Sequence, residues 1–92
     1  MCSLLIKRSA ERDLRKLSRV ILVRVNEKIL ALRHNPCPSG VRKLAGALEG
    51  WRIRVGDYRI LYQIDDDAQT VTIVRVKHRR EVYRWLSSHN LP

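Results

Sequence analysis

Residues 51–64, WRIRVGDYRILYQI, decide the fold that we predict for this chain of 92 residues. Apolar and polar residues alternate on both sides of Gly56-Asp57, and a period of two is typical of strands with one buried face. A two-residue loop with glycine first suits a type II′ turn, which joins antiparallel strands tightly. The stretch therefore predicts a β-hairpin with one apolar and one polar face.

Pairing across this turn assigns each side chain of the hairpin to a face of the sheet. Arg54 lies opposite Arg59 and Arg52 opposite Leu61, and all four share one face. A symmetrical loop at 65–69 would then place Arg75 beside Arg59 with Lys77 on the same side, although a slip of one residue would reverse this. The other face carries the residues expected to pack on helices: Trp51, Ile53, Val55, Tyr58, Ile60, Tyr62 and Ile64.

The rest of the chain supplies helices and two more strands. We expect a short strand over residues 3–8 and then a helix that Ser9 can cap. Apolar residues at helical spacing from Leu14 to Leu32 predict one long helix or a helical hairpin across roughly residues 10–34. A strand over 70–76 follows the hairpin, and residues 78–86 are predicted to form a short C-terminal helix or turn.

The predicted class is α+β, in a single domain that spans residues 1–92. The sheet is expected to be antiparallel and three- to four-stranded, with the N-terminal strand as the fourth. An N-terminal helical hairpin packs on one face, and a short C-terminal helix ends the chain. A chain this short buries about one sheet against one or two helices.

The charge of the chain indicates a polyanionic partner. Nineteen Lys and Arg oppose nine Asp and Glu, which gives a net charge of +10, and 14 of the cations are arginines. Arginine binds phosphate through two parallel hydrogen bonds, whereas lysine acts as a point charge. The alternative is a solvated basic surface on a ribosome-associated protein.

Cysteine and histidine usage argues against disulfides and metals. Cys2 and Cys37 are too few for a disulfide framework, and we expect both to be free thiols in a reducing cytosol. Neither a signal peptide nor a transmembrane span is recognised, so the expected location is cytoplasmic. Three histidines and two cysteines fall at no metal-ligand spacing, and we expect neither a metal nor a cofactor.

The arginines of the polar hairpin face predict an anion site. Like charges directly opposite each other destabilise a sheet, and sequences usually tolerate such a conflict at functional sites. A row formed by Arg54, Arg59 and Arg75, one strand spacing apart, would match successive oxygens of a phosphodiester chain. The alternative is that these arginines extend into solvent or pair with acidic residues such as Asp65, Asp66 or Glu49. We favour the anion site because three strands contribute to one patch.

Residues 77–83, KHRREVY, are predicted to leave the last strand beside this patch. His78 is the only group there that ordinarily titrates near neutral pH. Tyr83 can stack on a base or donate a hydrogen bond to phosphate. A lone histidine or tyrosine is usually structural, but the neighbouring arginines make a role in RNA chemistry more plausible for both.

Three segments resemble the RelE branch of the RelE/ParE toxin superfamily. They are KLAG at 43–46, GWRIRVGDYRILY at 50–62 and VKHRREVY at 76–83. The resemblance implies an endoribonuclease that enters the ribosomal A site and cuts messenger RNA. The ribose 2′-hydroxyl attacks the adjacent phosphate and leaves a 5′-hydroxyl end. It also implies neutralisation by a cognate antitoxin, which we expect to be acidic.

The resemblance carries the family's functional positions onto this chain. Its basic pair falls on Arg52 and Arg54, its strand arginine on Arg59, and its late cation and stacking tyrosine on the Arg79 region and Tyr83. With the patch, this gives a predicted catalytic set of Arg54, Arg59, His78, Arg79 and Tyr83. The predicted RNA-binding set is Lys43, Arg52, Arg75, Lys77 and Arg80.

One departure from the family pattern shifts the expected chemistry. The best-studied pattern of the family has lysines where this chain has Arg52 and Arg54. Arginine stays charged, so Arg54 is a poor base and a good transition-state clamp. His78 becomes the candidate for proton transfer, as base or acid, unless the ribosome alone positions the hydroxyl. The rival functions are a ParE-like inhibitor of DNA gyrase and a non-catalytic basic RNA-binding module.

Overall fold

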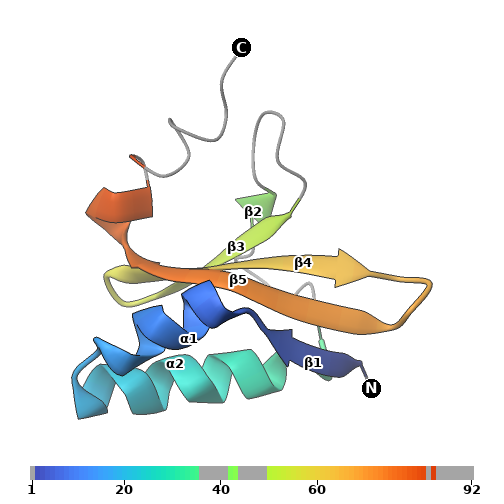
Figure 1. Ribbon diagram of the computed structural model, residues 1–92, viewed down its shortest axis with the longest axis horizontal. Coiled ribbons are helices and arrows are strands. Elements are labelled where there is room, and N and C mark those ends of the chain that lie inside the picture. The colour runs from blue at the N-terminus through green and yellow to red at the C-terminus, as the bar shows by residue number, and fades with distance from the viewer. Residues whose placement is uncertain (1, 36–41, 44–49, 83, 85–92) are drawn as a thin grey trace.

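The computed structural model describes residues 2–35, 42–43, 50–82 and 84. Two helices and five strands follow one another, and residues 79–82 add a helical turn (Figure 1). The α+β class is confirmed. The elements are β1 (Ser3–Ile6), α1 (Arg8–Arg15), α2 (Arg19–Ala31), β2 (Arg42–Lys43), β3 (Trp51–Val55), β4 (Tyr58–Asp65) and β5 (Thr70–His78).

The helical region is a pair of helices, one of the two arrangements that the sequence left open. Ser18 ends the connection by capping α2, where its hydroxyl accepts a 3.5 Å hydrogen bond from the Ile21 N–H. The expected cap at Ser9 is wrong, because α1 starts two residues earlier, at Arg8, and its N-cap is Lys7. Neither helix of the described part is long and apolar enough to cross a membrane.

The sheet is mixed and has five strands, in the order β1-β5-β4-β3-β2. The strands from β2 to β5 pair antiparallel, but β1 pairs parallel with β5. The expectation of a wholly antiparallel sheet was therefore wrong in this strand. Parallel neighbours need a long crossover, and here the whole chain between residues 6 and 70 lies between the two strands. The two-residue β2 is too short to show a period in the sequence.

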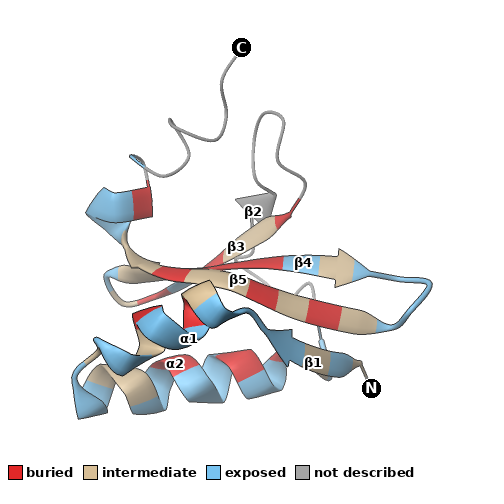
Figure 2. Cartoon of the chain, in the orientation of Figure 1, coloured by how far each residue is buried: buried red, intermediate tan, exposed pale blue. Residues whose placement is uncertain are grey.

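Helices α1 and α2 cover one face of the sheet, and the helical turn after β5 lies on the other side (Figure 1). Buried residues of α2 and the sheet meet in between (Figure 2). Leu61 and Val82 are also buried but do not belong to this core. The core consists of Ala10, Val25, Ile29, Leu32, Ile53, Val55, Ile60, Tyr62, Val71, Ile73 and Val76.

The β3–β4 hairpin has the predicted register, with Arg54 opposite Arg59 and Arg52 opposite Leu61. Gly56 has a φ of +59°, and the only non-glycine residue of the described chain with positive φ is Gln69. A positive φ at Gly56 but not at Asp57 agrees with the predicted type II′ turn.

The β4–β5 register differs from the prediction. Arg59 pairs with Lys77, and Arg75 lies opposite Leu61. The loop is one residue shorter than expected, because Asp65 already pairs with Thr70, and Val74 is a bulge without a partner. Together these shift the pairing by two residues, which changes the partners but preserves the face.

Candidate nucleic-acid interface

Three arginines from three elements meet at the tip of the β3–β4 hairpin. Arg54 Nε and Arg59 Nη1 both donate to the Gly56 carbonyl oxygen, at 3.1 and 3.3 Å. Arg24 of α2 places its Nη1 3.8 Å from the position that a Cβ on Gly56 would occupy. We call Arg24, Arg54 and Arg59 the tip cluster.

Two members of the tip cluster, Arg24 and Arg54, carry positive charge that no described carboxylate pairs with. The ion pairs within the described residues join Asp13, Arg75, Lys77 and Glu81, and none involves Arg24 or Arg54. Like charges placed together destabilise a fold, and such a local conflict is expected where a ligand compensates it. Guanidinium groups match phosphate oxygens in geometry and charge. The hairpin tip can therefore hold an oxyanion.

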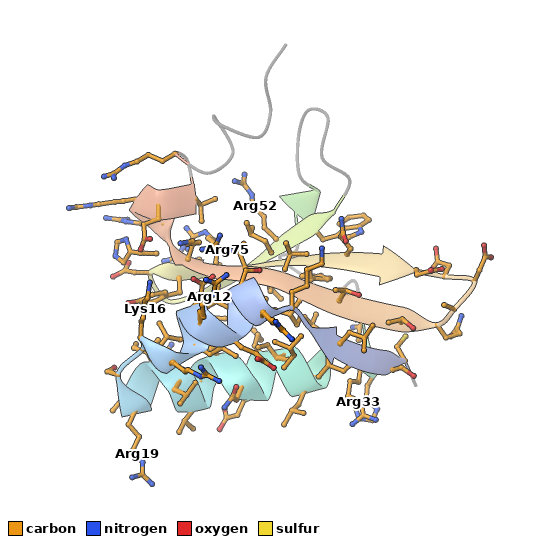
Figure 3. The ribbon with its side chains drawn as sticks, viewed as in Figure 1. Arg12, Lys16, Arg19, Arg33, Arg52 and Arg75 are labelled. Atoms are coloured by element: carbon orange, nitrogen blue, oxygen red, sulfur yellow. The ribbon has the colours of Figure 1, made fainter. Side chains whose placement is uncertain are left out.

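Arg52 extends the basic surface along β3. Its side chain is half-buried and points to the side of the sheet away from α1 and α2 (Figure 3). The register places it opposite Leu61 on β4 and Arg42 on β2. The predicted RNA contact of Arg52 is therefore compatible with its position.

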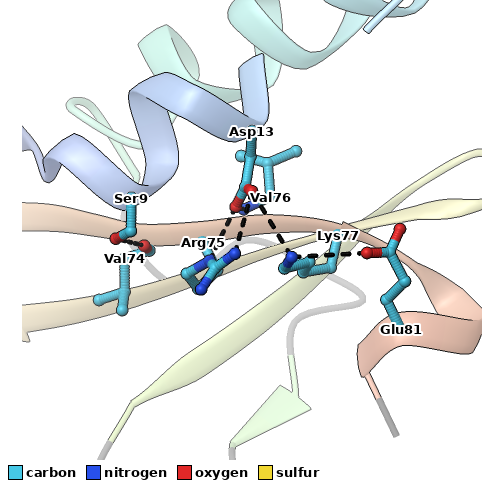
Figure 4. A network of polar contacts seen from close by, with 7 residues as sticks. All are labelled: Ser9, Asp13, Val74, Arg75, Val76, Lys77 and Glu81. Atoms are coloured by element: carbon cyan, nitrogen blue, oxygen red, sulfur yellow. Dashed lines mark hydrogen bonds and ion pairs between the residues drawn. The ribbon is translucent and has the colours of Figure 1, made fainter. Parts of the chain in front are cut away.

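The predicted RNA contacts Arg75 and Lys77 have an internal partner, the carboxylate of Asp13 on α1 (Figure 4). Arg75 Nε and Nη2 donate to the two oxygens of Asp13 at 2.9 and 3.1 Å. Lys77 Nζ lies 3.6 Å from Asp13 Oδ1 and donates to Glu81 Oε2 at 3.4 Å. The expected row of Arg54, Arg59 and Arg75 is thus not formed, because Lys77 takes the position opposite Arg59.

Asp13 also binds a backbone group on the edge of β5, at a point where β1 no longer pairs with it. It accepts the buried backbone N–H of Val76 at 3.0 Å, and Ser9 donates its hydroxyl hydrogen to the carbonyl of the bulged Val74 at 2.8 Å. Burial raises the pKa of Asp13, but the hydrogen bonds from Arg75 and Val76 and the positive charges outweigh it. The pKa of Asp13 is therefore held below the ordinary value of 3.8. This carboxylate is a charged, structural part of the fold.

His78 lies at the end of β5 but not on the face of Arg59. It pairs with Tyr58, and the two rings contact edge to face at 5.4 Å between centroids. Its Nδ1 accepts the Arg80 backbone N–H at 3.3 Å, which leaves Nε2 for other contacts. The expected position beside the sheet arginines needs correction, because the register puts His78 with Tyr58, whose strand neighbour Ile60 belongs to the helix-covered core.

His78 nevertheless shares a hollow with part of the tip cluster. The hollow has a volume of about 380 Å³ and opens at the end of the sheet. It is lined by Ile21, Arg24, Arg54, Gly56, Asp57, Tyr58 and His78. A phosphate bound between Arg24 and Arg54 would therefore lie near the histidine.

The remaining predicted site residues lie near or outside this region. Arg79 donates its backbone N–H to the Asp57 carbonyl at 2.7 Å, and the side chains of Arg79 and Arg80 are exposed on the helical turn. The backbone of Lys43 pairs with Trp51, but its side chain is outside the described residues, as is Tyr83. Roles for these residues remain predictions.

Two residues of the region were missed from the sequence. Arg24 lies between the apolar positions of α2, and only the packing of that helix beside the hairpin brings it to Gly56. The sequence gives no signal for Asp13, which lies among the basic residues of α1. Among the described residues, no group of three His, Cys, Asp or Glu side chains could hold a metal.

Known proteins resemble this chain over most of its length. A family model described as the ParE toxin of the type II toxin–antitoxin system parDE matches residues 4–83. Toxin RelG of Mycobacterium tuberculosis is 44% identical over 80 residues, which cover 83% of this chain and 88% of RelG. Toxin RelE of the same organism is 37% identical over 81 residues, covering 86% and 82%.

Solved structures share the fold. The toxin–antitoxin complex RelBE2 of M. tuberculosis includes a chain with a TM-score of 0.76 and 38% identity, covering 85% of this chain and 98% of that one. The isolated RelE toxin of E. coli has a TM-score of 0.73 at 24% identity, covering 99% and 100%. At that identity the second likeness shows the fold alone.

Proposed function

Because the chain belongs to the RelE branch of the RelE/ParE toxins of type II toxin–antitoxin systems, we propose that it cuts messenger RNA in the ribosomal A site. The observation that supports this best is the tip cluster beside His78. A phosphodiester is the ligand that would neutralise these guanidinium groups. The proposed enzyme needs no metal of its own.

The proposed reaction transfers the phosphoryl group within the RNA. The ribose 2′-oxygen attacks the adjacent phosphorus, the bond to the 5′-oxygen of the next nucleotide breaks, and a 2′,3′-cyclic phosphate and a 5′-hydroxyl result. One proton leaves the 2′-hydroxyl and one must reach the leaving 5′-oxygen. Charge develops on the phosphorane oxygens between these steps.

Each residue of the site has a role that fits its chemistry. Arginine stays protonated, so Arg54 and Arg59 would stabilise the phosphorane rather than take up protons. The Nε2 atom of His78 is the candidate for proton transfer, because Nδ1 already accepts a hydrogen bond. Arg52, Arg79 and Arg80 would hold flanking phosphates.

Type II toxins are paired with an antitoxin, and several solved relatives are such complexes. We propose that an acidic segment of the antitoxin covers the basic face of β3 and β4 or displaces the segment at 82–86. Either arrangement would neutralise charge and block the site. Hydrogen exchange measured with and without the antitoxin tests this, since unchanged protection at 50–60 and 76–82 would reject it.

A cleavage assay tests the main proposal. Purified protein is added to ribosomes carrying a defined messenger RNA in the A site, and primer extension maps the ends. We expect cuts in the A-site codon, and an Arg54→Ala/Arg59→Ala variant should lose them while Arg19→Ala, an exposed arginine of α2, retains them. Ribosomes whose messenger stays intact under these conditions would rule the proposal out.

A second candidate function follows from the ParE description of the matching family model. A ParE-like toxin would inhibit DNA gyrase by binding it. A supercoiling assay with purified gyrase separates the two. Inhibition of supercoiling together with intact messenger RNA would favour this alternative.

A further inference from the structure

We propose that Arg24 of α2 and Arg54 of β3 clamp one phosphate of single-stranded RNA at the hairpin tip. The RNA would then pass from the open face of the sheet, around Gly56, into the hollow that contains His78. This inference rests on RNA being the substrate, as proposed above. It adds Arg24, a helix residue, to a binding surface otherwise built from the sheet and its C-terminal turn.

The two guanidinium groups lie against the same backbone position. Arg54 Nε donates to the Gly56 carbonyl at 3.1 Å. Arg24 Nη1 lies 3.8 Å from the position that a Cβ on Gly56 would occupy. The two arginines lie 30 positions apart in the sequence and reach Gly56 from different elements. Two guanidinium groups that approach from different elements can both donate hydrogen bonds to one phosphate.

Open space lies beside both arginines. One hollow of about 380 Å³ continues toward Tyr58 and His78, and another of about 400 Å³ runs along α2 past Glu27 and Lys28. Both are lined by Arg24, Arg54 and Gly56, and both arginines are exposed. A phosphate can therefore approach the pair from solvent without any rearrangement of the core.

Within the part of the chain that the structure describes, no carboxylate forms an ion pair with Arg24 or Arg54. Asp57 and Glu27 line the hollows, but neither forms an ion pair with Arg24 or Arg54 within the described residues. The contrast is Arg75, whose guanidinium is held in two hydrogen bonds by the buried Asp13. Arg24 and Arg54 thus retain donors for a ligand, whereas Arg75 serves the fold.

The proposed clamp also explains how RNA could reach His78. The histidine pairs with Tyr58 and shares no face with Arg59, so RNA lying flat on the open face would not reach it. A phosphate held by Arg24 and Arg54 would lie beside the hollow that the rings of His78 and Tyr58 also line. The RNA would reach His78 by turning around the hairpin tip.

The test measures binding without ribosomes. A short fluorescent RNA with 2′-O-methyl groups cannot be cut by the proposed reaction, and its anisotropy gives the affinity as salt is varied. Each phosphate contact to single-stranded nucleic acid contributes about 0.7 to the slope of log affinity against log salt. We expect Arg24→Ala to reduce the slope by about one such contact.

Matched variants make the result decisive. Arg19→Ala removes the same charge from the same helix away from the tip and should leave the slope unchanged, while Arg24→Lys should keep the slope but bind more weakly than wild type. In an Arg54→Ala background, the loss caused by Arg24→Ala should be smaller, because the clamp is already broken. Circular dichroism confirms that each variant is folded.

The outcomes separate this inference from the proposed function. Equal slopes for wild type and Arg24→Ala, or equal losses for Arg24→Ala and Arg19→Ala, would overturn the clamp. Weaker antitoxin binding by Arg24→Ala with unchanged RNA binding would overturn it too, by assigning Arg24 to the protein partner. A clamp seen in binding, in a protein that leaves ribosomal messenger uncut, would support the inference and reject the proposed nuclease.

Discussion

Removing the carboxylate of Asp13 should destabilise the protein more than removing any single exposed charge would. Asp13 is 5% exposed and accepts two hydrogen bonds from Arg75 and one from the buried N–H of Val76. Asp13→Ala leaves that N–H unsatisfied, which costs about 1–3 kcal/mol, and breaking a buried ion pair costs about 3–5 kcal/mol. The Arg75 side chain is 24% exposed and can regain water, so we expect about 3 kcal/mol in all.

A loss of this size is a large part of the stability of a small domain, which is about 5–15 kcal/mol. It corresponds to a fall in Tm of roughly 12–24 °C for a chain of this length. Asp13→Asn should cost nearly as much, because the amide nitrogen cannot accept hydrogen bonds and would face the donors of Arg75 or Lys77. Asp67→Asn, an exposed carboxylate of the β4–β5 loop, is the matched control and should cost about 0.5 kcal/mol or less.

The effect should depend on pH with a definite sign. The pKa of Asp13 is lowered in the folded protein, so its contribution to stability is complete above the ordinary value of 3.8. It is lost as the pH falls through the folded pKa. Wild type and Asp13→Asn should therefore differ most at neutral pH and converge in acid.

Urea unfolding followed by circular dichroism, repeated at several pH values, measures both effects. The gap between wild type and Asp13→Asn is the quantity of interest. A gap below about 0.5 kcal/mol at pH 7, or one that stays constant into acid, would refute the assignment of Asp13 as a buried, charged anchor.

Three further predictions concern the hairpin and the chemistry. Arg54→Ala/Arg59→Ala should flatten the salt dependence of RNA binding by about two phosphate contacts, and an unchanged slope would place the binding surface elsewhere. Gly56→Ala should cost about 1–2 kcal/mol in thermal unfolding because φ is +59°, whereas Asp57→Ala, with no such backbone, should cost less. His78→Ala should lower ribosome-dependent cleavage by roughly a hundredfold through lost proton transfer, and Arg59→Ala should lower it through lost stabilisation of the phosphorane. Wild-type rates in His78→Ala would make the histidine structural.

The sequence predicted the parts of the structure that local rules control. The β3–β4 register follows from one two-residue turn, so Arg54 and Arg59 could be paired in advance. The β4–β5 register could not, because the shorter loop and the bulge at Val74 are settled by packing. The two deviations together preserved the face of Arg75 but gave Arg59 a different neighbour.

The candidate site was predictable to the extent that it lies on the hairpin. Arg24 joins it only through the placement of α2, and helical spacing alone does not say which element an exposed arginine will approach. Asp13 is buried because β1 ends early and leaves the β5 edge open, a pairing between distant segments. His78 was expected near the arginines, and its hollow contains Arg54, but the strand pairing puts it with Tyr58.

The parallel pairing of β1 with β5 has a consequence for how the toxin is made. The first strand of the chain, Ser3–Ile6, has its partner at Thr70–Ile73, and Asp13 likewise waits for Arg75 and Val76. Chains are synthesised from the N-terminus at about 5–20 residues per second, so these early segments remain without partners until residues 70–76 have been made. Contacts this distant in sequence also slow folding. A nascent copy is therefore expected to become a toxin only after β5 has been synthesised, when an antitoxin can already be present.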